Sequence, residues 1–258
     1  MLKDGTIIAV KGLENTGQGI EEFLAKVDTI GNIHHSNLVK LIGYRVEKRL
    51  RILVYEYMSR GSLDKWIFHE NSNFCLDWKT RKKIVLDIPK GLAYLHRDCR
   101  QRIAHLDVKP QNILLDDNFN AKVSDFGLSK LINRDQSQVV TRIRGTLGFG
   151  IVLLEVVRGR KILDYSQPDS DVSLLNLLKK KCLGNRLMNI IDLTSEDLQQ
   201  HLEEVNAMTM LGLWCVNEDY TRRPCMSSVV KMLEEEKMPE PGCHLRFPLA
   251  FPVPPSDN

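Results

Sequence analysis

The sequence has no hydrophobic stretch long enough to cross a bilayer. Its longest apolar run, residues 150–157 (GIVLLEVV), is interrupted by Glu155, and a membrane helix needs roughly 20 apolar residues. The first residues also lack the basic and apolar regions of a signal peptide. We therefore expect no membrane span in this chain and a cytoplasmic location.

Paired or clustered cysteines are also missing. The six cysteines are widely spaced, with no CxxC pair and no Cys/His cluster. This cysteine pattern therefore indicates neither a zinc site nor a disulfide framework. It is consistent with a reducing compartment.

A strong charge of one sign is absent as well. The formal net charge is +3, from 36 basic and 33 acidic residues. The short basic runs at residues 81–83 and 179–181 are typical of water-facing helix surfaces. We expect no nucleic-acid partner, because such partners select for much larger basic patches.

The 258 residues, 43% of them hydrophobic, are enough for one large domain or two lobes. Residues 6–11, 38–46 and 51–57 have the composition of strands. In residues 19–31 the apolar side chains recur on one helical face. These elements predict a small lobe of mixed sheet plus one helix over residues 1–58.

Helical patterns dominate after Ser62. Asp77 is a plausible N-cap for a long helix over residues 77–96. Further helices are predicted at residues 62–68, 174–183, 202–216 and 226–236. The larger, mainly helical lobe would cover residues 59–236, and a proline-rich tail with no packed element would cover residues 237–258.

One polar motif stands in an apolar neighbourhood, HLDVKPQN at residues 105–112, and SDFG follows at residues 124–127. Phosphoryl transfer needs a carboxylate to orient a hydroxyl, cations near the migrating group, and oxygen ligands for magnesium. Asp107 would orient the hydroxyl and Lys109 would neutralise charge on the γ-phosphate. Asn112 and Asp125 would hold Mg2+.

These motifs, with AVK at residues 9–11, strongly resemble the eukaryotic protein kinase family. The phrases LVYEYMSRGSLDKWIF, DVKPQNILLD, KVSDFGLSK and RRPCMSSVVKML resemble plant receptor-like kinases, specifically the group with S-locus or bulb-lectin ectodomains. The resemblance implies an α+β, bilobal protein-kinase-like fold, and ATP and Mg2+ as cofactors. Lys109, two residues after Asp107, resembles Ser/Thr kinases and not tyrosine kinases.

Further site residues follow from the resemblance alone. Lys11 would contact ATP, with Ala9 above the adenine and Leu114 below it. Tyr55 would be the gatekeeper, and Glu56 and Met58 would supply the hinge backbone. An apolar spine linking the lobes would comprise Ile30, Leu41, His105 and Phe126.

The resemblance also implies partners: ATP, and a protein substrate or a partner kinase. A chain that is part of a longer receptor would lie at the cytosolic face of the plasma membrane. Leu106 replaces the Arg that often precedes the catalytic Asp, so we expect a non-RD kinase that is not activated by loop phosphorylation.

Two departures affect the small lobe. The sequence begins within what resembles the second kinase strand, so we expect a truncated lobe without the glycine-rich phosphate loop. Gly17 and Gly19 follow Lys11 and cannot replace that loop. Lys26 stands where the family has the Glu that pairs with Lys11. Glu22, one turn earlier, would pair with Lys26 on the helix surface or, after a shift, with Lys11.

Two further departures affect the large lobe. At residues 149–150 the activation segment runs straight into GIVLLEVV. By comparison with the family it resembles, we expect the substrate-docking segment, the Ala-Pro-Glu motif and the amino-terminal part of the following helix to be deleted together. Arg223 would lose the Glu that its family counterpart pairs with. Pro89 lies inside the predicted long helix, where it should kink the helix or remove the hydrogen bond to the Val85 carbonyl.

Three interpretations therefore stay open. The chain is an ATP-dependent Ser/Thr protein kinase, a catalytically impaired pseudokinase or decoy that binds a partner, or the product of a truncated or mis-spliced gene. The intact set of Lys11, Asp107, Lys109, Asn112 and Asp125 favours the kinase class.

Overall fold

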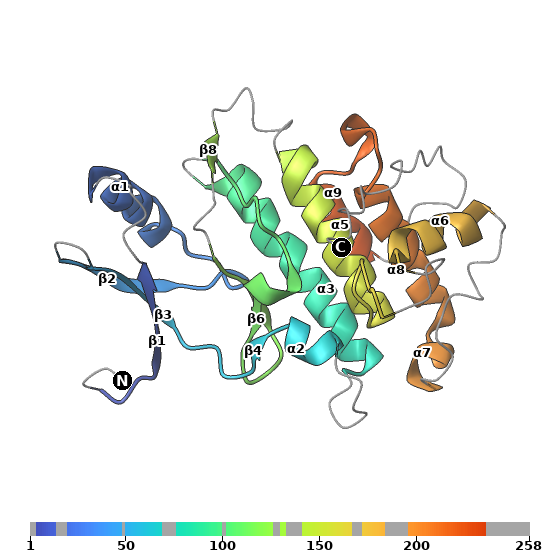
Figure 1. The fold of residues 1–258 in the computed structure, drawn as a ribbon, viewed down its shortest axis with the longest axis horizontal. Helices are drawn as coiled ribbons and strands as arrows, with labels where there is room; N and C mark the ends of the chain where they lie inside the picture. Colours follow the sequence, from blue (N-terminus) through green and yellow to red (C-terminus); the bar gives the residue numbers. More distant parts are fainter. Residues whose placement is uncertain are drawn as a thin grey trace, which may run out of the picture.

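The computed structural model forms two lobes (Figure 1). It describes residues 4–13, 20–47, 50–68, 76–99, 102–125, 130–132, 141–166, 172–183 and 196–235. The predicted tail at 237–258 lies outside these residues, as do Gly17 and Gly19.

The small lobe is an antiparallel sheet with one helix beside it. The sheet contains β1 (Ile8–Leu13), β3 (Leu50–Glu56) and β2 (Leu41–Glu47), in the order β1-β3-β2. Helix α1 (Ile20–Gly31) packs Phe23 and Val27 against Leu53 of the sheet. The predicted α+β small lobe is therefore present, with element ends within a few residues of the expected ones.

The large lobe is mainly helical and carries two short sheets. Its helices and helical turns are α2 (Asp64–Ile67), α3 (Trp78–Ala93), η2 (Tyr94–Asp98), η3 (Pro110–Asn112), η5 (Thr141–Thr146), α5 (Leu147–Arg158), α6 (Leu174–Leu183), α7 (Glu196–Gln200), α8 (Leu202–Cys215), η7 (Tyr220–Arg222) and α9 (Met226–Glu235). Strands β4 (Gly61–Ser62), β6 (Ile113–Leu115) and β7 (Ala121–Val123) form one sheet, and β5 (Arg102–Ala104) pairs with β8 (Lys130–Ile132).

Helix α3 begins where the sequence predicts. The Asp77 carboxylate accepts a hydrogen bond from the Thr80 amide at 2.8 Å, which confirms the N-cap. The helix continues without interruption through Pro89, which is buried. It changes at Tyr94 into the wider π-helical turn η2, so the prediction of one regular helix to residue 96 is wrong at its end.

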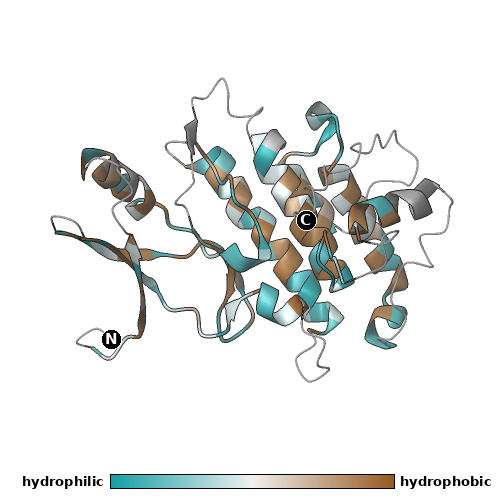
Figure 2. Ribbon diagram, viewed as in Figure 1, coloured by the Kyte–Doolittle hydropathy of each residue, from teal (hydrophilic) through white to brown (hydrophobic). Residues whose placement is uncertain are grey.

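Helix α5 is the centre of the large lobe, and Figure 2 shows hydrophobic colouring over most of it. Helices α5 and α8 pack closely because each has a glycine at the contact. Gly150 of α5 lies against α8, and Gly212 of α8 lies against α5. A Cβ on Gly150 would lie 2.7 Å from the Cβ of Cys215. The absence of side chains at these two positions therefore permits the tight helix pair.

The activation segment joins α5 directly. Turn η5 ends at Thr146, α5 begins at Leu147, and residues 149–150 lie inside the continuous helix. Thr146 is buried and its hydroxyl donates to the Pro224 carbonyl at 3.2 Å. Arg223 is not left without a partner, because its Nε donates to the Asn217 carbonyl at 2.7 Å.

The lobes meet through backbone contacts around Asn37. The Val123 amide donates to the Asn37 carbonyl at 2.9 Å, and the Asn37 side chain donates to the Ala121 carbonyl at 3.1 Å. Gly91 of α3 also lies against the Asn37 carbonyl. A Cβ added at Gly91 would lie only 2.7 Å from the carbonyl oxygen of Asn37. This junction fixes how β1 and the large lobe face each other across the site.

Among the described residues, none of the helices combines the length and the apolar character that crossing a membrane requires. Cys99, Cys215 and Cys225 are free thiols.

Candidate active site

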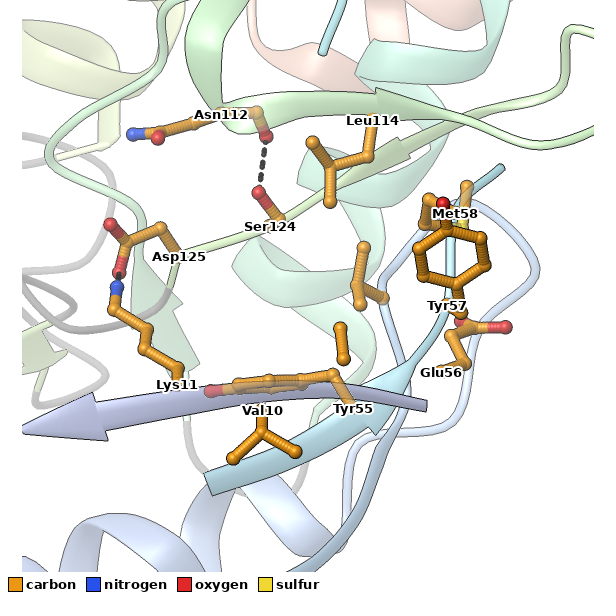
Figure 3. Close-up of a pocket in the computed structure, with 12 residues that line it drawn as sticks. Val10, Lys11, Tyr55, Glu56, Tyr57, Met58, Asn112, Leu114, Ser124 and Asp125 are labelled. Atoms are coloured by element: carbon orange, nitrogen blue, oxygen red, sulfur yellow. Dashed lines mark hydrogen bonds and ion pairs between the residues drawn. The ribbon is translucent and has the colours of Figure 1, made fainter. Parts of the chain in front are cut away.

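A cavity of about 340 Å³ lies between the lobes. Figure 3 shows Lys11 and Asp125 at one end of it and the segment from Glu56 to Met58 at the other. Its lining consists of Ala9, Val10, Lys11, Val39, Tyr55, Glu56, Tyr57, Met58, Asn112, Leu114, Ser124 and Asp125. An apolar middle with polar groups at both ends suits a flat heterocycle that carries a charged group.

Lys11 closes the charged end. Strand β1 places the side chains of Ala9 and Lys11 on the same face, and both line the cavity. Val10 also borders the cavity but is 60% exposed. The Lys11 Nζ lies 2.8 Å from Oδ1 of Asp125. The two lobes thus contribute opposite charges to one point.

Two features mark this end as specialised. Asp125 has a φ of 59°, in the left-handed region that non-glycine residues adopt rarely and mostly at functional sites. Burial, together with the charge of Asp125, raises the pKa of Tyr55 to about 12. Tyr55 therefore stays a neutral hydroxyl beside the ion pair.

The loop from His105 to Asn112 holds its carboxylate firmly. Oδ2 of Asp107 accepts hydrogen bonds from Asn112 Nδ2 at 3.0 Å and from Lys109 Nζ at 2.8 Å. Within the described part of the chain, no group donates to Oδ1 of Asp107. That oxygen is thus positioned to accept a proton or hydrogen bond from a bound hydroxyl.

His105 connects this loop to the strand that leads to Asp125. Its Nε2 lies 2.7 Å from the Ser124 carbonyl, and its Nδ1 lies 3.2 Å from the Asp107 amide. Nε2 must therefore donate and Nδ1 must accept, which describes a neutral ring. Burial lowers the pKa of His105, in agreement with that tautomer.

The segment opposite Lys11 is fixed by a pair of charges that sequence reasoning missed. The Glu56 carboxylate contacts Lys122 Nζ at 2.7 Å and accepts a hydrogen bond from the Lys40 amide at 2.7 Å. Lys122 lies on β7 of the large lobe, so this ion pair joins the lobes beside the cavity. Local sequence patterns contain no signal for a pair separated by 66 residues.

The donor set fits a magnesium ion. Asn112 uses Nδ2 for both contacts to Asp107, at 2.8 Å to the backbone carbonyl and 3.0 Å to the carboxylate, which leaves the amide oxygen available. Carboxylate and amide oxygens are the ligands that magnesium accepts in proteins. Asn112 and Asp125 both line the cavity.

The structure brings together most of the residues that the sequence singled out. All six residues predicted to contact ATP line the cavity, as do Asn112 and Asp125. Asp107 and Lys109 do not line the cavity: Asp107 accepts a hydrogen bond from Asn112, and Lys109 contacts Asp107. The contributions of Val10, Val39, Tyr57 and Ser124 were not predicted. Ser124 directly precedes the Asp-Phe-Gly motif, which is the signal that could have found it.

Three expectations lie outside the described residues. They concern the side chains of Glu22 and Lys26, and Phe126 of the proposed spine. The other spine members are placed: Ile30 is buried in the main core, Leu41 packs against that core, and His105 is 1% exposed.

Comparisons with known proteins identify the family of the chain. A family model described as the protein kinase domain matches residues 1–150. The chain is 46% identical over 254 residues to the G-type lectin S-receptor-like serine/threonine-protein kinase SD2-5 of Arabidopsis thaliana, covering 90% of this chain and 31% of that protein.

Two other relatives come from cereals. The rust resistance kinase Lr10 of Triticum aestivum is 41% identical, covering 90% of this chain and 40% of its own length. The G-type lectin S-receptor-like serine/threonine-protein kinase LECRK2 of Oryza sativa subsp. japonica is 38% identical, covering 89% of this chain and 31% of its own. The chain thus spans less than half the length of these three relatives.

Proposed function

Because this chain belongs to the protein kinase family, and within it to the plant receptor-like serine/threonine kinases, we propose that it transfers the γ-phosphoryl group of ATP to Ser or Thr hydroxyls of proteins. The main support for this proposal is the arrangement of four polar residues between the lobes. Lys11 and Asp125 meet at 2.8 Å at the end of a cavity that Asn112 also lines, and Asn112 in turn holds Asp107.

The adenine would bind between Ala9 of β1 and Leu114 of β6, in the apolar part of the cavity. Tyr55 also lines the cavity, and Glu56 and Met58 lie at the end away from Lys11 (Figure 3). The Glu56–Lys122 ion pair is only 18–28% exposed, so it would keep this hinge in place when the lobes move.

The triphosphate would extend toward Lys11. Protein kinases generally use ATP with Mg2+. Asn112 and Asp125 would hold the ion through their side-chain oxygens. A bound ion neutralises charge that builds up on the phosphates during transfer. Lys11 would then exchange its contact with Asp125 for phosphate oxygens.

Asp107 would receive the hydroxyl of the protein substrate on Oδ1 and orient it for in-line attack on the γ-phosphorus. Its Oδ2 is already held by Asn112 and Lys109, so the carboxylate is positioned before substrate arrives. Lys109 would stabilise negative charge on the transferred group. A protein substrate or a partner kinase is the proposed macromolecular partner.

Nucleotide binding is the first step to test. MgATP should raise the melting temperature of the chain in a thermal-shift titration, and Asp125→Asn should abolish the shift. Asp117→Asn is the matched control, since Asp117 is an exposed acid that contacts Ser59 and does not line the cavity. An unchanged MgATP response in Asp125→Asn would contradict the assigned metal site.

A further inference from the structure

A second and larger cavity, of about 530 Å³, lies away from the proposed ATP site. Its lining consists of Asp28, Thr29, Asn32, Ile33, Tyr94, Cys99 and Ile103. None of these residues lines the first cavity. The first four come from the end of α1 and just beyond it. Tyr94 comes from η2, Cys99 directly follows η2, and Ile103 comes from β5 of the large lobe.

One wall of this cavity is apolar. Ile33 and Ile103 are buried, at 7% and 2% exposure. The Tyr94 ring packs on His35 with centroids 5.0 Å apart, which fixes the aromatic face. This wall can take the hydrocarbon part of a ligand.

The polar lining residues of this cavity offer hydrogen-bond acceptors. The Thr29 hydroxyl donates to the Ala25 carbonyl at 2.9 Å, and the Asn32 amide nitrogen donates to the Asp28 carbonyl at 2.7 Å. These donors are therefore occupied by the helix itself. The Asp28 carboxylate and the Asn32 amide oxygen accept no hydrogen bond from the described residues. A ligand that binds here must supply donors.

Two sources of negative charge near the cavity would attract a cation. Asp28 lies in the last turn of α1, where the carbonyl end of the helix dipole is negative, and this turn contains no basic residue. The charge of Asp98 adds to the field, because it raises the pKa of the nearby Cys99 thiol, although burial is the larger cause. The charge of Lys90 contributes to lowering the pKa of His35, although burial is the larger cause. The Lys90 Nζ is itself paired with Oε1 of Glu234 at 2.9 Å.

We propose that this cavity binds a small organic cation, an ammonium group carried on an aryl or alkyl body. The ammonium would donate to Asp28 and Asn32 at the rim, and the body would lie on Ile33, Ile103 and Tyr94. This goes beyond the proposed transfer of phosphate and does not depend on it. The site would link α1 to β5, the strand that ends one residue before His105.

Cys99 provides a reporter inside the cavity. Burial raises the pKa of its thiol to about 11, so it should react slowly with N-ethylmaleimide, and a bound ligand should slow it further. The probe is phenethylamine, which is protonated at neutral pH, and its neutral counterpart is 2-phenylethanol. Peptide mass spectrometry would follow Cys99 and, as an internal control, Cys225, which does not line the cavity.

Phenethylamine should slow Cys99 labelling several-fold and leave Cys225 unchanged, whereas 2-phenylethanol should have little effect. Asp28→Asn should remove the protection. Glu21→Gln, an exposed acid at the other end of α1, should retain it. Equal protection by the alcohol, full protection in Asp28→Asn, or no protection of the wild-type chain would each overturn the proposal.

Discussion

The Nζ of Lys11 lies 2.8 Å from Oδ1 of Asp125, so a strand of the small lobe and the Asp-Phe-Gly segment of the large lobe meet through one ion pair. Both side chains are partly exposed, at 44% and 36%, so the pair contributes little to stability. Its importance is positional, because it joins the two lobes at the charged end of the cavity.

Replacing Lys11 should weaken MgATP binding with little change in the stability of the folded chain. Lys11→Met should abolish the thermal shift produced by MgATP, because no cation remains to contact the phosphates. The free energy of unfolding without nucleotide should change by less than about 1 kcal/mol, as for other exposed ion pairs. Chemical denaturation measures the second quantity, and Lys231→Met, an exposed lysine on α9, is the control. Normal MgATP binding by Lys11→Met would show that Lys11 does not contact the nucleotide.

His105 should matter for both folding and transfer. His105→Leu deprives the Ser124 carbonyl and the Asp107 amide of their partner, which should cost about 1–3 kcal/mol of stability. Because the loop then loses its hold on Asp107, phosphate transfer should fall more than MgATP binding. The exposed His34→Leu change is the control. Equal losses of binding and transfer would point to general unfolding instead.

The buried carboxyl group of Glu155 should make the free energy of unfolding depend on pH. Burial raises its pKa from 4.5 to about 7, despite the hydrogen bond from the Ile162 amide. The folded state therefore binds a proton that the unfolded state releases, and stability should fall as pH rises from about 4.5 to about 7.

Comparison with a variant isolates this effect from other titrating groups. Glu155→Gln keeps an acceptor for the Ile162 amide but cannot ionise, so it should be more stable than the wild type above pH 7, by up to about 3 kcal/mol. The two proteins should converge below pH 4.5. Denaturant midpoints across this range test it, and parallel pH profiles would show that Glu155 is not the group responsible.

Gly150 should not tolerate a methyl group. The added Cβ would lie 2.7 Å from the Cβ of Cys215 and 2.8 Å from Cγ1 of Val216, so α5 and α8 would have to separate. Gly150→Ala should lower the free energy of unfolding by about 1–3 kcal/mol. Gly12→Ala is a matched control, because nothing lies within 4 Å of its Cβ position. A neutral Gly150→Ala would show that the helices are less tightly packed.

Local patterns predicted the elements well and their ends less well. Apolar periodicity located α1, and the carboxylate of Asp77 located the start of α3, because both effects act within one or two turns. The π-helical turn η2 was missed, since the same residues also satisfy an α-helical pattern. The replacement partner of Arg223 is a backbone carbonyl, for which the sequence has no signal.

The motifs and the family resemblance predicted which residues lie together around the cavity, and the structure supplied their connections. The role of His105 as a bridge depends on which ring nitrogen donates, and this follows only from its two neighbours in space. The Glu56–Lys122 ion pair likewise joins distant strands. The roles assigned to Asp107, Lys109, Asn112 and Asp125 remain predictions until activity is measured.

Phosphate transfer by the purified chain is the activity on which the proposed function depends. The measurement is incorporation of radiolabelled γ-phosphate from MgATP into a generic Ser/Thr substrate, beside an Asp107→Asn variant that keeps an oxygen for Asn112 and Lys109 to contact. We predict labelling by the wild-type chain that disappears in Asp107→Asn, with MgATP binding retained in both. Absence of labelling by a wild-type chain that binds MgATP would contradict the account and identify a nucleotide-binding pseudokinase.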